Sequence, residues 1–219
     1  MLVHPYDGAM SETEWRDWIA QSAKFGVLAV GAGEGKAPIM VPTHFVVRGD
    51  EILIHLHKVN DALPLLESGA RVSLSIVGDY AFIPGTWRAK DSSNLQDGVP
   101  TSYYAAVNFE CEPSVVSDAH GIAAIIQEHM TEFQADGSYA EVAPESTPYG
   151  PMFSIIRGVR LKILNVDAKF KYDDHKPVAF RESVIAKLRS RNSHLDAGAS
   201  NQQSRRLAEI GEWSQFRQD

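Results

Sequence analysis

Two polar side chains that could bind an anion follow a short apolar strand near the middle of the chain. Lys58 and Asn60 stand directly after that strand, and a short helix is expected to begin next. A phosphate is bound best where a cation and several hydrogen-bond donors converge, and the first N–H groups of a helix are such donors. This junction is therefore predicted to bind an anion; the alternative is an ordinary solvated turn.

Histidines offer a second kind of chemistry. His55 and His57 fall on the same face of the strand predicted over residues 51–57, and His44 belongs to the preceding strand. Such a group could hold a metal ion. However, no carboxylate follows at the spacing of a cupin-type metal site, and His129 lies on the apolar side of a predicted helix, as a core or interface residue would. We therefore expect no metal site.

The usual motifs of hydrolytic and redox enzymes are missing from the sequence. It contains no GxSxG, CxxC or GxGxxG motif, and the Gly-rich turn over residues 31–36 lacks the spacing of a phosphate loop. Cys111 is the only cysteine, so it forms no internal disulfide. Its neighbours Glu110 and Glu112 would raise the pKa of its thiol. Cys111 is expected to be packed and unreactive, and no residue is assigned as catalytic.

Composition limits the partners of this protein. The 219 residues include 44% apolar side chains, enough for one large domain or two small ones, and the net charge is −7. This acidic balance argues against direct nucleic-acid binding. The basic residues near the C-terminus are expected to form the solvated faces of two helices. They are Lys187, Arg189, Arg191, Arg205 and Arg206.

No apolar run reaches the roughly 18 residues that a membrane-spanning helix needs. The N-terminal segment also lacks the basic and apolar stretches of a secretory signal. We therefore expect a cytoplasmic protein that makes no contact with a membrane.

Alternating and helical patterns predict a mainly β fold with flanking helices, arranged as an antiparallel barrel. A capping box at residues 11–14 predicts the first helix, whose buried face would carry Trp15, Trp18 and Ile19. A polar loop over residues 85–100 is a candidate lid. The predicted strands cover residues 25–30, 39–47, 51–57, 71–84, 101–116 and one or two segments within 152–172; the later helices cover 118–133, 180–191 and 202–216.

Several short motifs, taken in order, resemble those of a known family. They are VPTHF at 41–45, HKVN at 57–60, GDYAFIP at 78–84 with Trp87, VPTSYYAAV at 99–107, IRG at 156–158 and KFK at 169–171. Over about residues 1–190 the chain resembles the PaiB-like FMN-binding split-barrel proteins, described as negative transcriptional regulators. The resemblance implies a homodimer with FMN between two barrels. Residues 1–176 would form the split-barrel domain and residues 177–219 a C-terminal helical extension packed on it.

The resemblance also implies a set of flavin-binding residues. Lys58 would pair with the phosphate, and Lys169 and Lys171 would reach across the dimer. Aromatic rings would stack on or wall the flavin ring. The full set is Thr43, His44, His57, Lys58, Asn60, Trp87, Thr101, Tyr103, Tyr104, Lys169 and Lys171.

Two segments depart from the usual pattern of the family. Thr101-Ser-Tyr-Tyr104 stands where the family usually has Thr-Trp-Asn-Tyr, and Lys169-Phe-Lys-Tyr-Asp-Asp-His175 where it usually has Lys-Phe-Lys-Leu-Ser-Gln-Asn. The two acids of the second segment would repel a phosphate if they faced it.

A flavin-dependent oxidoreductase is the function that this resemblance favours. One alternative is a transcriptional regulator that acts through DNA or a partner protein. Another is a split barrel that binds haem or another planar ligand through His44 or His57.

Overall fold

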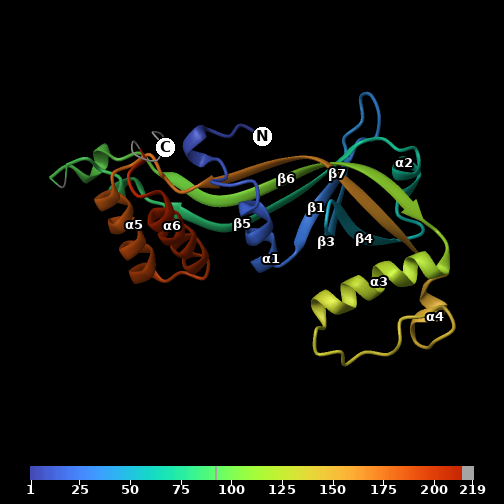
Figure 1. The fold of residues 1–219 in the computed structure, drawn as a ribbon. Coiled ribbons are helices and arrows are strands. Elements are labelled where there is room, and N and C mark those ends of the chain that lie inside the picture. The colour runs from blue at the N-terminus through green and yellow to red at the C-terminus, as the bar shows by residue number, and fades with distance from the viewer. Residues whose placement is uncertain (92, 214–219) are drawn as a thin grey trace. The chain divides into compact units, whose positions relative to one another are not determined.

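The computed structural model describes residues 1–91 and 93–213. Its strands form one seven-stranded antiparallel sheet in the order β2-β1-β5-β6-β7-β4-β3, which confirms the mainly β split-barrel fold (Figure 1). The strands are β1 (Phe25–Val30), β2 (Ile39–His44), β3 (Val46–Arg48), β4 (Glu51–His57), β5 (Val72–Ile83), β6 (Thr101–Val116) and β7 (Ile156–Lys171).

Helices flank the strands. They are α1 (Glu14–Gln21), α2 (Leu63–Glu67), α3 (Ala119–Phe133), α4 (Tyr149–Met152), α5 (Val178–Arg191) and α6 (Asp196–Ile210), with short 3-10 helices at Pro5–Asp7, Gly85–Trp87 and Leu95–Asp97. In the described part of the chain, no helix has the length and apolar character needed to cross a bilayer.

Most predicted elements are confirmed, and two differ. The strand expected over residues 39–47 is divided at Phe45, whose N–H donates to Lys24 O instead of to a neighbouring strand. The last helix begins at Asp196 and not at residue 202, because the Asp196 carboxylate accepts the Ser193 N–H and so fixes the start of the helix. The predicted residues 214–216 of that helix lie outside the described residues.

The chain divides into two compact units. The first unit comprises Met1–Trp18, Val77–Val107 and Asp167–Asp219, and the second comprises Ile19–Ile76 and Asn108–Val166. Strands β5, β6 and β7 each contribute residues to both units.

In the first unit, α5 and α6 lie side by side (Figure 1). Trp15 and Trp18 of α1 are buried as predicted, and the Trp18 indole donates a 2.8 Å hydrogen bond to Asp79. Arg181 and Arg206 are fully buried despite their charge. Buried guanidinium groups need acceptors, so this unit must supply carboxylates and carbonyls inside its core.

In the second unit, α3 packs against β3 and β4 (Figure 1). Gly158 of β7 pairs with His55 of β4. A Cβ atom at Gly158 would lie only 2.6 Å from Cδ1 of Ile125 on α3, so glycine lets the helix approach the sheet closely. Arg48 of β3 also pairs with Glu128 and Glu132 of α3. These contacts fix the helix face that carries His129.

Candidate functional site

Four of the predicted flavin-binding residues come together in the first unit. The Lys171 ammonium donates a 3.0 Å hydrogen bond to the Thr101 hydroxyl. The ring of Tyr104 lies 5.9 Å from the ammonium groups of both Lys169 and Lys171. We call Thr101, Tyr104, Lys169 and Lys171 the Lys171 cluster. It combines cations, a hydroxyl and an aromatic face, the features that a flavin phosphate and ring require.

The two lysines of this cluster have different environments. Lys169 is buried; it donates to Leu2 O at 2.8 Å and lies 3.8 Å from the carboxylate of Asp7. Burial raises the pKa of the Asp7 carboxyl, and Lys169 opposes that rise. Lys171 is half-buried, and no carboxylate of the described residues forms an ion pair with it. Lys171 is therefore the lysine with charge to offer a ligand.

The predicted stacking of Tyr103 and Trp87 on a flavin requires exposed ring faces, and neighbouring side chains cover both rings. Tyr103 is fully buried, and its hydroxyl donates to Asp173 at 3.0 Å and accepts from Gln203 at 3.1 Å. Burial holds the pKa of Tyr103 well above its usual value. The Trp87 ring has the Arg191 guanidinium 4.7 Å from its centroid. In this structure the ring face of Tyr103 is unavailable for stacking. Tyr104 remains as the tyrosine of the predicted set that could stack on a flavin ring.

The acidic residues that depart from the family pattern point into the protein. Asp173 is buried and pairs with Arg88, and Asp174 accepts a 2.5 Å hydrogen bond from Nε of Arg206. Burial raises the pKa of the Asp174 carboxyl, while Arg206 lowers it. These carboxylates are neutralised internally, so the repulsion considered from the sequence does not arise.

The Lys58–Asn60 junction lies in the second unit. The Lys58 ammonium is exposed and lies 3.1 Å from Ser154 O. Asn60 Oδ1 accepts the Ala62 N–H at 2.9 Å. The N–H groups of Leu63 and Leu65, at the start of α2, bond to the carbonyl oxygens of Asn60 and Ala62. The backbone donors predicted to bind an anion are therefore already used within the protein. At this junction, the exposed Lys58 ammonium remains as the cation that a ligand could reach.

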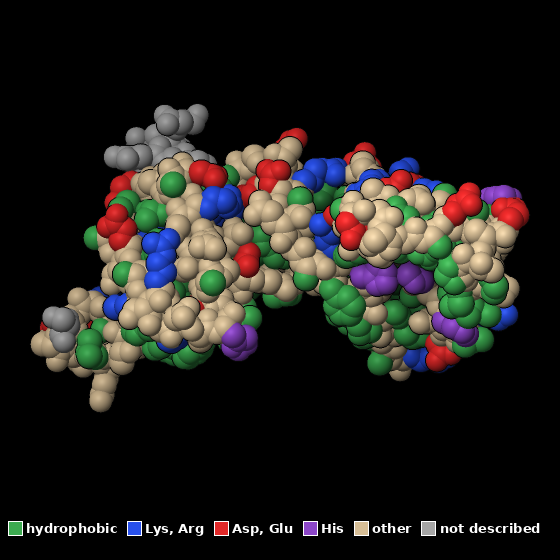
Figure 2. All heavy atoms as spheres, turned by 90° about the horizontal axis from the view of Figure 1, so that it is seen from below, with side chains coloured by type: hydrophobic (Ala, Val, Ile, Leu, Met, Phe, Trp, Pro, Cys, Tyr) green, Lys and Arg blue, Asp and Glu red, His purple; other side chains and the backbone are tan. Residues whose placement is uncertain are grey.

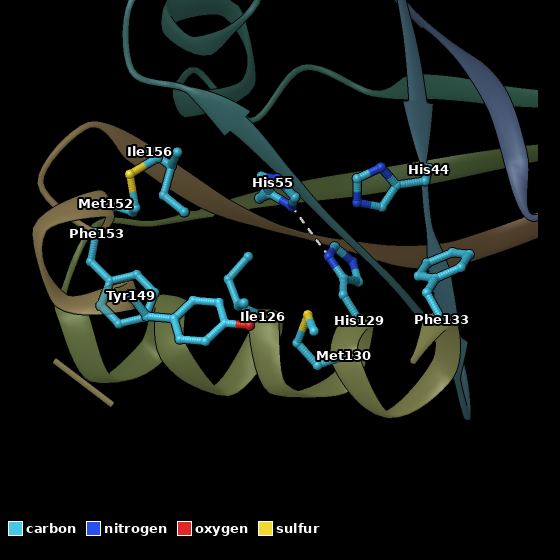
Figure 3. Close-up of a pocket in the computed structure, with 10 residues that line it drawn as sticks. All are labelled: His44, His55, Ile126, His129, Met130, Phe133, Tyr149, Met152, Phe153 and Ile156. Carbon is cyan, nitrogen blue, oxygen red and sulfur yellow. Dashed lines mark hydrogen bonds between the residues drawn. The ribbon is translucent and has the colours of Figure 1, made fainter. Parts of the chain in front are cut away.

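A cavity of about 520 Å³ also lies in the second unit (Figure 3). His44, His55 and His129 form its polar side. The other lining residues are mainly apolar: Ile126, Met130, Phe133, Tyr149, Met152, Phe153 and Ile156. In the space-filling view, histidine side chains on this face are bordered by hydrophobic ones (Figure 2). Among the predicted residues, His44 therefore borders a cavity.

The other predicted residues nearby do not line this cavity. His57 is exposed, and its Nδ1 accepts the Val59 N–H at 3.3 Å. Thr43 is buried, and its hydroxyl donates to His44 O at 3.0 Å.

His129 is buried on the apolar side of α3, as the sequence predicted, but its polar contacts were not predicted. Its Nδ1 lies 3.2 Å from Nδ1 of His55, and its Nε2 lies 2.9 Å from Leu53 O. Burial lowers the pKa of His44 and His129, and it lowers that of His55 to about 4 with help from the two neighbouring rings. All three rings are therefore neutral at pH 7. The one sequence signal was a histidine within the apolar stripe of α3.

The chain matches a family model described as "Putative FMN-binding domain" over residues 1–165. A search of curated proteins for sequences similar to this chain finds no match. The Lys171 cluster fits such a cofactor, because it offers a cation and a hydroxyl for a phosphate and a ring face for the isoalloxazine.

Several solved structures share the fold. A conserved hypothetical protein of Mycobacterium tuberculosis is 19% identical, with 78% of this chain and 90% of that chain covered and a TM-score of 0.54. The FAD and haem binding protein of Mycobacterium smegmatis is 17% identical, with 74% and 72% covered and a TM-score of 0.53. The flavocytochrome Anf3 of Azotobacter vinelandii is 13% identical, with 73% and 67% covered and a TM-score of 0.55.

These identities are low, so the structures support the fold alone, and the family model supplies the assignment. The resemblance found in the sequence motifs is confirmed. The chain belongs to the family of FMN-binding split-barrel proteins, and its cofactor is FMN.

Proposed function

We propose that this protein is a flavin-dependent oxidoreductase that holds its FMN through the Lys171 cluster. The observation that carries the proposal is the Lys171 ammonium, which lies beside Thr101 and the Tyr104 ring and forms no ion pair with a carboxylate of the described residues. In this arrangement Lys171 would neutralise phosphate charge, Thr101 would orient the lysine, and Tyr104 would supply a flat apolar wall.

The only cysteine of this protein is not suited to covalent catalysis, and this favours chemistry carried by a bound cofactor. Burial and the neighbouring Glu110 raise the pKa of Cys111 to about 12, so its thiol is no nucleophile at neutral pH. A bound flavin accepts and donates electrons, while the protein controls its position and access. The flavin-binding and flavocytochrome descriptions of two similar structures agree with this proposal.

The regulator alternative finds less support. Arg205 and Arg206 pair with Glu14, and Arg191 pairs with Asp196. Their charges are largely used within the first unit, whereas DNA binding requires Lys and Arg that are free to reach phosphates. A gel shift on DNA at low salt would revive this alternative.

A homodimer in the cytoplasm remains part of the proposal. The family resemblance implies that Lys169 and Lys171 reach a flavin held by a second copy. Sedimentation of the protein with and without FMN tests this: a dimer is expected in both, and a monomer that binds FMN fully would contradict it.

Titration with FMN, followed by flavin absorbance and fluorescence, is the direct test of the site. Wild-type protein should bind about one FMN per chain. Lys171→Ala should weaken binding by about 10-fold to 100-fold, because a hydrogen bond to a charged group contributes roughly 1.5–3 kcal/mol. Lys162→Ala is the matched control, since Lys162 is an exposed lysine on the same strand. Equal affinity in the Lys171→Ala protein would refute the cluster as the phosphate site.

Lys58→Ala tests the second predicted cation in the same assay. A loss of FMN affinity would assign Lys58 to the flavin phosphate, and an unchanged affinity would exclude Lys58 from the site.

The oxidoreductase step is tested separately. The oxidation of a reduced nicotinamide dinucleotide is followed with the FMN-loaded protein and with free FMN at equal concentration. A rate no greater than that of free FMN would contradict the enzyme proposal while leaving FMN binding intact.

A further inference from the structure

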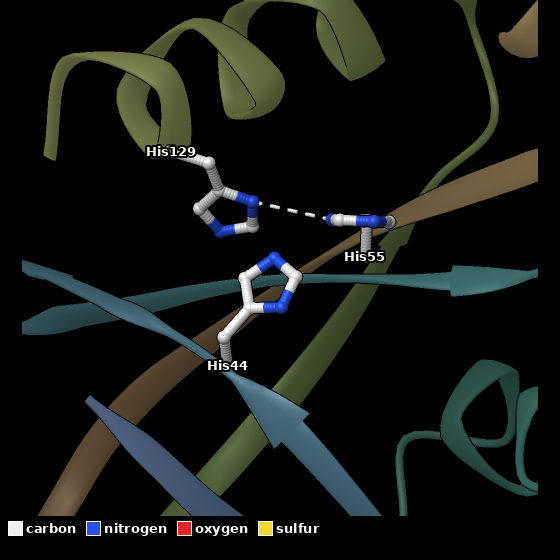
Figure 4. A group of neighbouring side chains, drawn as sticks. All are labelled: His44, His55 and His129. Carbon is white, nitrogen blue, oxygen red and sulfur yellow. Dashed lines mark hydrogen bonds between the residues drawn. The ribbon is translucent and has the colours of Figure 1, made fainter. Parts of the chain in front are cut away.

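We propose that His44, His55 and His129 bind a single divalent transition-metal ion of the Zn²⁺ class, with one coordination position open to the adjoining cavity. The site belongs to the second unit and shares no residue with the Lys171 cluster. Figure 4 shows the three rings turned toward a common point, His44 from β2, His55 from β4 and His129 from α3.

The distances between the rings suit one ion. One nitrogen from each ring can be chosen so that all three lie within 4.8 Å of one another. The Nδ1 atoms of His55 and His129 are 3.2 Å apart. Two imidazole nitrogens that bind one tetrahedral Zn²⁺ at about 2.0–2.1 Å are separated by about 3.3 Å. The observed pair therefore already has nearly the spacing of two ligands.

The orientation of the rings is also that of a ligand set. The ring centroids are 5.0–5.2 Å apart and the ring planes are inclined by 46–69°. The His44 ring thus meets the other two rings edge to face, and the rings of His55 and His129 are tilted toward each other, so nitrogens of all three rings can converge. Parallel stacked imidazoles would direct their lone pairs along parallel planes and could not share one ion.

A backbone carbonyl fixes the tautomer of His129. Leu53 O can only accept a hydrogen bond, so Nε2 of His129 carries the proton and its Nδ1 presents a lone pair toward His55. Metal-bound histidines almost always donate their second N–H in this way, which holds the ring in place and makes it a stronger ligand. The contact joins α3 to β4, and the close approach at Gly158 sets that spacing.

His44 has no alternative partner for its ring. It is half-buried, and neither of its nitrogens has a hydrogen-bond partner among the described residues; its contacts are with the rings of His55, His129 and Phe133. A metal ion would supply the partner that the ring nitrogens of His44 lack.

The convergence of three nitrogens favours a bare ion over haem. Porphyrin iron has only two axial positions, and these lie on opposite faces of the ring, so three imidazoles cannot all bind it. Three protein ligands leave a tetrahedral ion one position for water or a small ligand. The cavity next to the rings has walls that include Met130, Phe133 and Tyr149, so the part of that ligand that extends from the ion into the cavity would be largely apolar.

The test uses the full chain after treatment with a chelator. Zn²⁺ is titrated against a coloured metal indicator, and Co²⁺ is added separately to record its visible d–d bands. One Zn²⁺ per chain and the intense bands of tetrahedral Co²⁺ are expected. Absence of saturable Zn²⁺ binding would overturn the proposal. So would a Soret band of stoichiometric haem in the purified protein, lost together with His44.

Variants locate the ion. His44→Gln should weaken Zn²⁺ binding more than about 100-fold, because even an outer-shell partner of a ligand is worth about 10-fold to 100-fold. His44 makes no hydrogen bond to the described protein through its ring, so this variant should keep the wild-type melting temperature without metal. His120→Gln is the control, since His120 is an exposed histidine on the same helix α3. Equal Zn²⁺ affinity in wild type and His44→Gln would refute the site.

The open position has its own measurement. Imidazole added to the Co²⁺ form should shift the d–d bands as it replaces water. Bands that do not change at saturating imidazole would refute the open position.

Discussion

Nε of Arg206 donates a 2.5 Å hydrogen bond to Asp174, and both side chains are completely buried. The same guanidinium donates to Glu14 at 2.8 Å and to Gly8 O at 2.9 Å. One residue of α6 thus joins the N-terminal segment to the turn that follows β7 within the first unit. The acidic residue that departs from the family pattern serves this internal contact.

Arg206→Met should destabilise the protein by about 3–5 kcal/mol, because it leaves the buried Asp174 carboxylate without its ion-pair partner. Urea unfolding measures the change. Arg189→Met is the control, since Arg189 is exposed on α5, and its free energy of unfolding should change by less than about 0.5 kcal/mol. Similar stability of the two variants would contradict the role of Arg206.

Asp196 should make stability depend on pH in the acid range. Hydrogen bonds from Arg191 lower the pKa of this carboxyl from 3.8 to about 2. The unfolded chain therefore binds the proton first as pH falls, so the stabilisation is complete above about pH 4 and is lost between pH 4 and pH 2. Lowering the pKa from 3.8 to about 2 corresponds to roughly 2 kcal/mol of stability.

Asp196→Asn should accordingly be less stable than wild type at pH 6 by about 2 kcal/mol, and the difference should shrink on acidification toward pH 2. Denaturant unfolding at several pH values measures it. Asp97→Asn, which changes an exposed aspartate, should follow the wild-type curve. A constant difference between wild type and Asp196→Asn at all pH values would rule out the proposed linkage.

Cys111 should resist thiol reagents in the folded protein. It is fully buried, and the pKa of its thiol is raised to about 12, so the reactive thiolate is scarce at pH 8. Ellman's reagent should detect no thiol in native protein and one thiol per chain in denaturant. Rapid reaction of the native protein would show that the strand around Cys111 opens readily.

Tyr104 should control the fluorescence of bound FMN if the Lys171 cluster holds the ring. A tyrosine that stacks on a flavin quenches its emission, so FMN bound to wild-type protein should be dim and FMN bound to Tyr104→Leu brighter. Tyr103→Phe is the comparison, because Tyr103 is buried and should leave the emission unchanged. Equal quenching in wild type and Tyr104→Leu would place the flavin ring elsewhere.

Local patterns in the sequence determined the elements that depend on neighbouring residues. The strand over residues 101–116 and the buried face of α1 follow from side-chain periodicity, and both agree with the structure. The burial of Cys111 and the influence of its neighbour Glu110 on the pKa of its thiol also agree with the sequence prediction. The order of short motifs was enough to identify the family, because those motifs lie at fixed positions along the chain.

The tertiary structure alone decided which side chains meet. His55 and His129 are 74 positions apart, and their contact depends on α3 packing over β4. Tyr103 and Tyr104 are neighbours in sequence, yet one is buried against Asp173 and the other lies beside Lys171. Periodicity reports the face of an element on which a residue lies, but not what covers that face. What covers that face depends on packing between residues that are far apart in the chain. The sequence around one residue does not reveal such contacts.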